Sequence, residues 1–183
     1  MQTYISILRG INVSGQKLIK MDALRKMFED IKFKKVKTYI QSGNVIFESS
    51  KSTIESLEKK IMKGIKESFG FDVPVLVKDL SELKIVLKNN PFLKKQNEDV
   101  SKLHVTFLSE IPSKENVEKI QAGNYGADEF VLEGKNIYLF CPNGYGNTKL
   151  TNNFFENKLK LSATTRNWKT VNELVSIAEN DNS

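Results

Sequence analysis

Hydrophobic and polar positions along the first 78 residues follow the periods of a strand, a helix, two strands, a second helix and a last strand. Apolar residues three and four apart indicate the helices, and short β-rich runs indicate the strands. Ser52 and Glu55 have the spacing of a capping box at the start of the second helix, and Gly70 is a stop signal at its end. The predicted helices cover 21–31 and 54–69, and the predicted strands cover 3–8, 36–40, 44–47 and 73–77.

The remaining residues repeat this pattern without its last strand. They begin with a linking helix over about 81–89, which ends before Pro91 because proline cannot continue a helix. A hairpin is predicted around Gly134, where two β-rich runs flank a short turn. The predicted strands are 102–108, 129–132 and 136–141, and the predicted helices are 113–122, 150–160 and 167–179.

This element order predicts an α+β fold made of two ferredoxin-like domains, each with a βαββαβ plan and an antiparallel sheet. The first domain covers 1–78, and the second covers 79–183 with the linking helix and the C-terminal helices. Right-handed crossovers set the strand order of such a sheet at 4-1-3-2. The end of the first strand therefore lies beside the hairpin between the second and third strands.

Polar residues gather at that point of the first domain. Fork-shaped donors and amide groups that converge on glycine-rich backbone suit a phosphate, a carboxylate or a base edge. The alternative is that these polar groups cap the sheet edge and satisfy its backbone. The candidate ligand-binding residues of this corner are Arg9, Gly10, Asn12, Gln41, Ser42 and Asn44.

The charge of the chain is uneven. The formal net charge is +6, yet residues 1–78 hold 15 Lys and Arg against 8 Asp and Glu, while residues 79–183 hold 13 against 14. A basic half is the electrostatic footprint of a protein that binds a polyanion. Solvated lysines on helix faces explain the same excess of positive charge, so the charge alone does not show that the chain binds a polyanion.

The start of the last predicted helix offers a second candidate anion site. Thr165 is a candidate cap, which places Arg166 and Asn167 where free N–H groups and the helix dipole attract an anion. The alternative is that Trp168 anchors the helix on the core and Arg166 pairs with a carboxylate. The loop 142–151 places glycines and a lysine before a helix, but it lacks the spacing of a P-loop and is interpreted as an ordinary loop.

The chain has few residues that bind soft metal ions. A single cysteine, Cys141, and a single histidine, His104, exclude an internal disulfide and make a zinc site untenable. The two residues form the one conceivable nucleophile and base pair, but no orienting carboxylate is evident and packing roles are favoured. We expect no metal, no cofactor, no membrane span and a reduced, cytoplasmic setting.

Four stretches carry a resemblance to a known family. With LRGINVSG, KMDALRKMF, TYIQSGNVIF and TTRNWKTVNEL in this order, the chain resembles the domain of unknown function 1697 family. The resemblance implies paired ferredoxin-like (α/β plait) domains and no established reaction. Ser14 stands where the pattern of the first stretch leads us to expect glycine. The signature positions carried over are Arg9, Gly10, Asn12, Tyr39, Gln41, Ser42, Gly43, Asn44, Arg166, Asn167 and Trp168.

The favoured function is binding of an anionic ligand, a nucleotide or nucleic acid, at the corner of the first domain. RNA-recognition domains of this plan stack bases on paired aromatics of the central strands, and the predicted third strand offers Phe47 alone. Two alternatives stay open: an enzyme that uses the same corner to hold a small phosphorylated or carboxylated molecule, and a non-catalytic protein-interaction module. The oligomeric state is not predicted.

Overall fold

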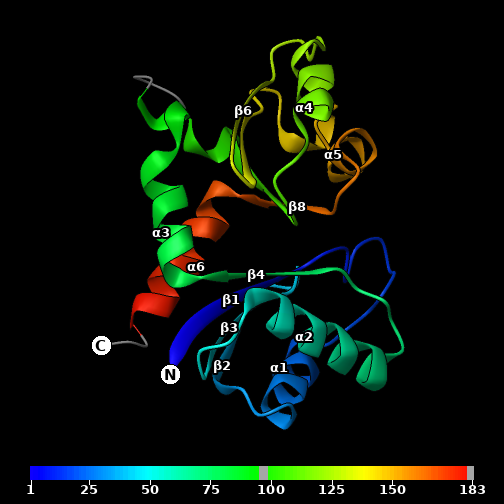
Figure 1. Cartoon of the computed structure of the whole chain (residues 1–183), viewed down its shortest axis with the longest axis vertical. Coiled ribbons are helices and arrows are strands. Elements are labelled where there is room, and N and C mark those ends of the chain that lie inside the picture. Colours follow the sequence, from blue (N-terminus) through cyan, green and yellow to red (C-terminus); the bar gives the residue numbers. More distant parts are fainter. Residues whose placement is uncertain (95–98, 181–183) are drawn as a thin grey trace. The chain divides into compact units, whose positions relative to one another are not determined.

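The structure, a computed structural model, describes residues 1–94 and 99–180 (Figure 1). These ranges hold two four-stranded antiparallel sheets and six α-helices, which confirms the α+β class. Contacts divide the chain into two compact units, one of Met1–Lys84 with the stretch from Glu173 onward, the other of Ile85–Asn172. None of the described helices is both long and apolar enough to cross a membrane.

The first unit has its elements in the predicted order. Its sheet has the strand order β2-β3-β1-β4, which confirms the order predicted from the crossovers. Helices α1 and α2 cover one face of this sheet (Figure 1), where Tyr4 of β1 stacks on Phe47 of β3 with ring centroids 5.8 Å apart. The elements are β1 (Gln2–Leu8), α1 (Met21–Asp30), β2 (Lys34–Tyr39), β3 (Asn44–Ser49), α2 (Ile54–Phe69) and β4 (Val75–Asp79).

The predicted C-terminal end of α2 is correct, and its predicted N-terminal cap is off by one residue. Gly70 ends the helix with φ of 77°, a conformation that glycine adopts without strain, so the stop signal is confirmed. The cap at the other end is Thr53, whose side chain accepts from the Ser56 N–H at 3.3 Å. The predicted capping box of Ser52 and Glu55 is therefore wrong by one residue, because the helix begins at Ile54.

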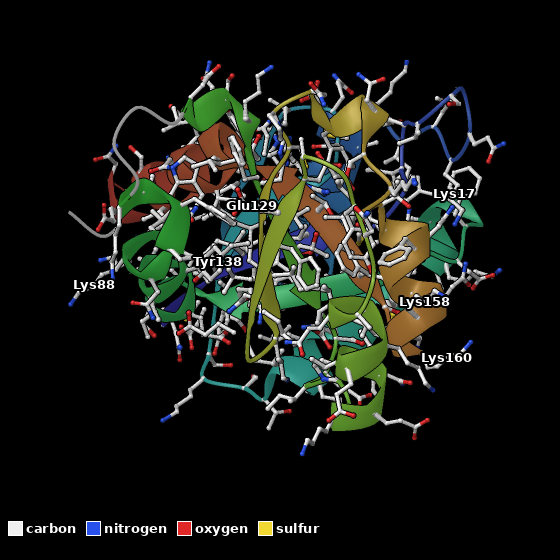
Figure 2. All side chains as sticks on the ribbon, turned by 90° about the horizontal axis from the view of Figure 1, so that it is seen from above. Lys17, Lys88, Glu129, Tyr138, Lys158 and Lys160 are labelled. Atoms are coloured by element: carbon white, nitrogen blue, oxygen red, sulfur yellow. The ribbon has the colours of Figure 1, made fainter. Side chains whose placement is uncertain are left out.

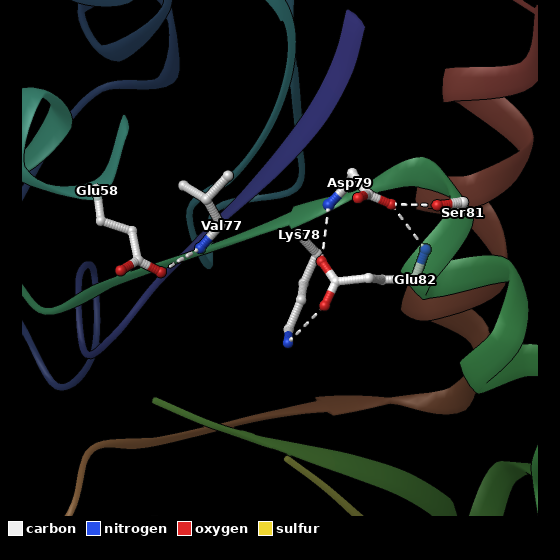
Figure 3. A network of polar contacts seen from close by, with 6 residues as sticks. All are labelled: Glu58, Val77, Lys78, Asp79, Ser81 and Glu82. Atoms are coloured by element: carbon white, nitrogen blue, oxygen red, sulfur yellow. Dashed lines mark hydrogen bonds and ion pairs between the residues drawn. The ribbon is translucent and has the colours of Figure 1, made fainter. Parts of the chain in front are cut away.

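A capping box formed by Asp79 and Glu82 lies at the start of α3 (Leu80–Asn89) (Figure 3). The Asp79 carboxylate accepts from the Glu82 N–H at 2.8 Å, and the Glu82 carboxylate accepts from the Asp79 N–H at 3.2 Å. Two free N–H groups of the helix start are thus satisfied reciprocally. Glu82 also pairs at 3.4 Å with the ammonium of Lys78, a lysine with only 8% of its side chain exposed.

The free edge of the first sheet at β4 is partly closed by a carboxylate. Glu58 of α2 accepts from the Val77 N–H at 2.9 Å (Figure 3). An unpaired strand edge is a template for association with another chain, so this bond removes one of its open donors. Near the chain's end, Lys84 of α3 pairs with Glu179 at 2.7 Å, which ties the C-terminal helix into the first unit.

The second unit repeats the plan and completes it with a strand that the sequence analysis lacked. Its sheet has the order β6-β7-β5-β8, and α4 and α5 line the core on one face. Strand β8 pairs with β5 along its length, with Thr165 opposite Thr106. The elements are β5 (Leu103–Leu108), α4 (Lys114–Gln121), β6 (Glu129–Glu133), β7 (Asn136–Phe140), α5 (Asn152–Leu159) and β8 (Ala163–Asn167). Helix α6 (Trp168–Asn180) follows β8, and its residues from Glu173 on belong to the first unit.

The new strand corrects the prediction for the last helix. Thr165 lies on β8, where its hydroxyl lies 2.7 Å from the Thr106 hydroxyl and donates to the Asn152 side chain at 2.7 Å, so it does not cap α6. Asn167 is the capping residue, since its side-chain oxygen accepts from the Thr170 N–H at 2.8 Å. Arg166 precedes the helix in the strand ladder, opposite Val105.

Candidate functional site

The end of β1 meets the turn between β2 and β3, as the strand order predicts. The Leu8 N–H donates to the Gly43 carbonyl at 2.9 Å, and the Arg9 N–H donates to the Pro74 carbonyl at 2.9 Å. We call residues 9–20 the corner loop and residues 40–43 the corner turn. Arg9, at the start of this loop, is partly buried, while Gln41 on the turn is exposed.

Asn12 fastens the corner loop to the corner turn. Its side-chain NH₂ donates to the carbonyls of Ile19 and Gln41, both at 2.9 Å, and its side-chain oxygen accepts from the Ile19 N–H at 2.8 Å. Both amide hydrogens of Asn12 therefore donate to backbone carbonyls. The chemistry available to Asn12 in this structure is positioning, which matches the alternative that polar groups satisfy the sheet edge.

Asn44 holds the corner turn in the same manner. It is fully buried, and its NH₂ donates to the Tyr39 carbonyl at 3.1 Å and to the Ser42 hydroxyl at 3.0 Å. These bonds close the turn around Gly43. A Cβ added to Gly43 would lie 2.6 Å from Ile11 Cδ1 and 2.9 Å from Leu8 Cβ, at φ of 81°. Glycine is therefore required there for space as well as for conformation.

Left-handed backbone is concentrated at the corner. The β-branched Ile40 adopts φ of 51° although 47% of it is exposed, which is a true outlier for such a residue. Each non-glycine residue in this region costs roughly 1–3 kcal/mol, and such strain clusters at sites with a function. The residues with positive φ in the corner loop and turn are Gly10, Asn12, Ser14, Gly15, Lys17, Ile40 and Gly43.

The chain segments that form the corner carry charge of one sign. Residues 1–21 and 31–47 contain no Asp or Glu, and their basic residues are Arg9, Lys17, Lys20, Lys32, Lys34, Lys35 and Lys37. Lys17, marked in Figure 2, donates to the backbone carbonyl of Asp72 at 2.7 Å, so this bond leaves its charge uncompensated. The Asp72 carboxylate itself pairs with Lys66 at 2.6 Å. Among these lysines, Lys35 pairs with Glu48 at 2.8 Å.

Three large aliphatic side chains are exposed on the same corner. Val13 and Leu18 of the corner loop are 56% and 66% exposed, and Ile40 lies on the corner turn. Isolated exposed apolar residues need no explanation, but these three lie on two segments that Asn12 joins. Sequence reasoning missed all three, because the hydrophobic pattern does not distinguish an exposed aliphatic residue from a core one.

The sheet of the first unit lacks the aromatic platform of an RNA-recognition domain. Tyr4 and Phe47 face the helices and belong to the core. The opposite face of the central strands holds buried aliphatic residues such as Ile5, Ile7 and Ile46. Bases therefore have no ring to stack on at the described residues of these two strands, which agrees with the prediction from the sequence.

The second candidate site lies in the other unit. Arg166 on β8 donates from Nη1 to the Thr165 carbonyl at 3.0 Å, and Asn167 directly precedes α6 as its cap. The Asn167 side-chain oxygen accepts from the Thr170 N–H, which occupies one of the donors that the helix start would offer to an anion. A cap at Thr165 would place Arg166 in the first turn of the helix, but Arg166 is part of β8 and α6 begins at Trp168.

His104 and Cys141 lie at adjoining ends of β5 and β7, and burial shifts the pKa of both side chains. Burial lowers the pKa of His104, whose ring stacks on Tyr145 at 4.8 Å. Burial raises the pKa of the Cys141 thiol to about 11. The raised pKa disfavours the thiolate, which is the reactive form of a cysteine. No group of three or more metal-ligating side chains occurs in residues 1–94 and 99–180.

Comparisons with known proteins agree with this fold. A family model described as "Protein of unknown function (DUF1697)" matches residues 1–138, which include the first three of the four stretches quoted above. No curated protein matches the chain. The structure of the conserved bacterial protein SP0830 from Streptococcus pneumoniae is similar, with a TM-score of 0.77 and 21% identity over 97% of this chain and 98% of that chain. At this identity the likeness concerns the fold alone.

Proposed function

We propose that, in this member of the family described as Protein of unknown function (DUF1697), the corner loop and corner turn bind an anionic, phosphate-bearing ligand. The observation that carries the proposal is the Asn12 side chain, whose three bonds hold a strained loop against the corner turn. The corner so formed lies on segments that contain basic residues and no acidic ones. A nucleotide or nucleic acid has the matching charge.

Within this proposal the candidate residues divide into two kinds. Arg9 supplies a planar fork of donors that matches two phosphate oxygens, and Gln41 supplies an exposed side-chain amide. Gly10, at φ of 71° with open space where a Cβ would lie, lets the ligand approach the backbone. Asn12 and Asn44, together with Ser42, hold this geometry through the bonds described above.

We also propose that the chain consists of two ferredoxin-like domains and works in a reduced setting. Two ferredoxin-like domains, 1–78 and 79–183, are supported by the βαββαβ order in each half and by the same strand order in both sheets. A reduced, cytoplasmic setting fits a chain with one buried cysteine. The ligand is recognised by its phosphates, because the described residues of the central strands β1 and β3 offer no ring for base stacking.

A matched pair of arginine variants tests this function. Arg9 and Arg25 are the two arginines of residues 1–78, and Arg25 lies on α1 with its side chain 51% exposed, 3.9 Å from Asp22. Labelled single-stranded and double-stranded oligonucleotides, and ATP, are titrated into the wild type, Arg9→Ala and Arg25→Ala at several salt concentrations. Arg9→Ala is expected to weaken binding by about tenfold or more, since a charge-assisted pair contributes roughly 1.5–3 kcal/mol.

Arg25→Ala removes the same charge and is expected to change affinity much less. For oligonucleotides, the logarithm of affinity falls linearly with the logarithm of salt if several phosphates are neutralised. Equal affinity of the two variants, or no binding of any of these ligands at low salt, contradicts the proposal.

The exposed aliphatic residues of the corner favour a second candidate function, a protein-interaction surface. Val13, Leu18 and Ile40 together with the surrounding lysines suit a partner that presents apolar and acidic side chains. Leu18→Asp separates the two functions. It abolishes binding of such a partner, whereas it reduces phosphate binding only through one added negative charge.

A further inference from the structure

A small hollow of about 200 Å³ lies in the second unit. One wall is the segment 125–128 before β6, and the other is the segment 143–149 after β7, the loop that lacks P-loop spacing. Its polar lining residues are Tyr125, Asp128, Asn143, Asn147 and Lys149. Ligand pockets of drug size measure about 300–1,000 Å³, so this hollow fits a smaller molecule.

Hydrogen bonds fix the walls of the hollow. Asp128 accepts from the Thr148 hydroxyl at 2.6 Å, and that hydroxyl accepts in turn from the Leu150 N–H at 3.0 Å. Asn147 donates to the Asn143 carbonyl at 2.8 Å, while Tyr125 donates to the Ile120 carbonyl at 2.6 Å. The Asp128 oxygen that binds Thr148 is Oδ2, and the Asn147 group that donates is its NH₂. These bonds leave Oδ1 of Asp128 and the side-chain oxygen of Asn147 as acceptors for a ligand.

The hollow is lined by one negative and one positive side chain. Asp128 is a carboxylate, Lys149 is an ammonium, and both line the hollow. No ion pair links these two side chains in residues 1–94 and 99–180, and the bond described for Asp128 goes to a hydroxyl. A ligand with one charge of each sign would complement both groups at once, whereas a simple anion or cation would meet one like charge.

We propose that this hollow binds a small zwitterion, a free α-amino acid, with its ammonium toward Asp128 and its carboxylate toward Lys149. The amides of Asn143 and Asn147 complete the hydrogen bonds of these two groups, as a polar ligand in a small site requires. The site is independent of the corner of the first unit.

Matched ligands test the zwitterion directly on the full-length wild type. Glycine carries both charges, glycine methyl ester keeps the ammonium alone, and N-acetylglycine keeps the carboxylate alone. Amide chemical shifts of residues 125–128 and 143–149 are followed by NMR as each probe is added. Saturable shifts of these amides with glycine, and affinity about tenfold or more weaker for either blocked form, are expected, because each blocked form loses one charge-assisted pair.

Two variants with a control then assign the groups. Asp128→Asn keeps an oxygen for the Thr148 hydroxyl and removes the charge, and Lys149→Gln removes the opposite charge. Each is expected to weaken glycine binding by about tenfold or more, while Glu129→Gln, a change at the neighbouring exposed carboxylate marked in Figure 2, leaves it unchanged. Equal binding of the three probes to the wild type, or no shift at these amides, overturns the proposal whether or not the variants fold.

Discussion

Replacing Asn12 by alanine tests how the corner is held. The substitution removes three hydrogen bonds to backbone groups, with lengths of 2.9, 2.9 and 2.8 Å. A typical bond contributes about 0.5–1.5 kcal/mol net, and the lower part of that range applies where water reaches the freed groups. Asn12 also adopts φ of 54°, which alanine tolerates less well by about 1 kcal/mol. We expect Asn12→Ala to lower the free energy of unfolding by about 2–4 kcal/mol.

Urea unfolding followed by circular dichroism and a thermal scan measure this loss. For a domain of 60–100 residues each kcal/mol lowers Tm by about 4–8 °C, so a drop of at least about 8 °C is expected for the transition of the first unit. Asn12→Gly serves as the matched control. Glycine loses the same bonds but accepts the left-handed backbone, so it should be more stable than the alanine variant by about 1 kcal/mol.

Two outcomes would refute this reasoning. A loss below about 0.5 kcal/mol in Asn12→Ala would mean that the three bonds are replaced by water at no cost. Equal stability of the alanine and glycine variants would mean that the left-handed conformation relaxes and stores no strain. Phosphate binding measured on the same variants separates positioning from stability, because a positioning residue lowers affinity even where the protein remains folded.

Further predictions concern Gly43 and the two titrating groups of the second unit. Gly43→Ala is expected to lower the free energy of unfolding of the first unit by about 2 kcal/mol or more, because the added Cβ would lie 2.9 Å from Leu8 Cβ at φ of 81°. The control Gly70→Ala places its Cβ in open space, so it should lose less stability in the same unfolding assay. Because burial lowers the pKa of His104 below 6.5, stability is fully present above pH 6.5 and falls as pH decreases, and His104→Gln should remove that part of the acid dependence measured by thermal scans. Because burial raises the pKa of the Cys141 thiol from 9.0 to about 11, stability is lost as pH rises through this range, and Cys141→Ser should flatten that limb. An unchanged pH profile in either variant would contradict the cause given.

Much of the fold follows from the sequence because its patterns are local. The periodicity around Leu24 and Phe28 gives α1, and Gly70 marks the end of α2, as the structure confirms. Strand β8 was missed because its five residues, Ala163–Asn167, include no large hydrophobic side chain, and pairing with β5 rather than alternation defines it. The linking helix was expected from about residue 81 and begins at Leu80, because Asp79, the last residue of β4, accepts from the Glu82 N–H as its cap.

The candidate site was predictable in position but not in mechanism. Strand order alone places Arg9 near Gln41, and the hydrogen bond from Leu8 to Gly43 confirms this proximity. The partners of Asn12 are the backbone carbonyls of Ile19 and Gln41, 7 and 29 residues away along the chain. A side chain that binds backbone leaves no signature in the identity of its partners, so sequence reasoning interpreted the Asn12 amide as available to a ligand.

The position of the strain bears on which function the corner has. A buried strained residue can be compensated by packing, but Ile40 is about half exposed and gains little from its neighbours. Holding Ile40 and the corner loop in left-handed conformations therefore costs stability that the Asn12 bonds only partly offset. A chain that needed a closed sheet end alone would be served by a shorter, relaxed turn. In the corner loop Leu18 is 66% exposed, and Gly10 has open space where a Cβ would lie, which supports the proposal that a ligand or partner binds there.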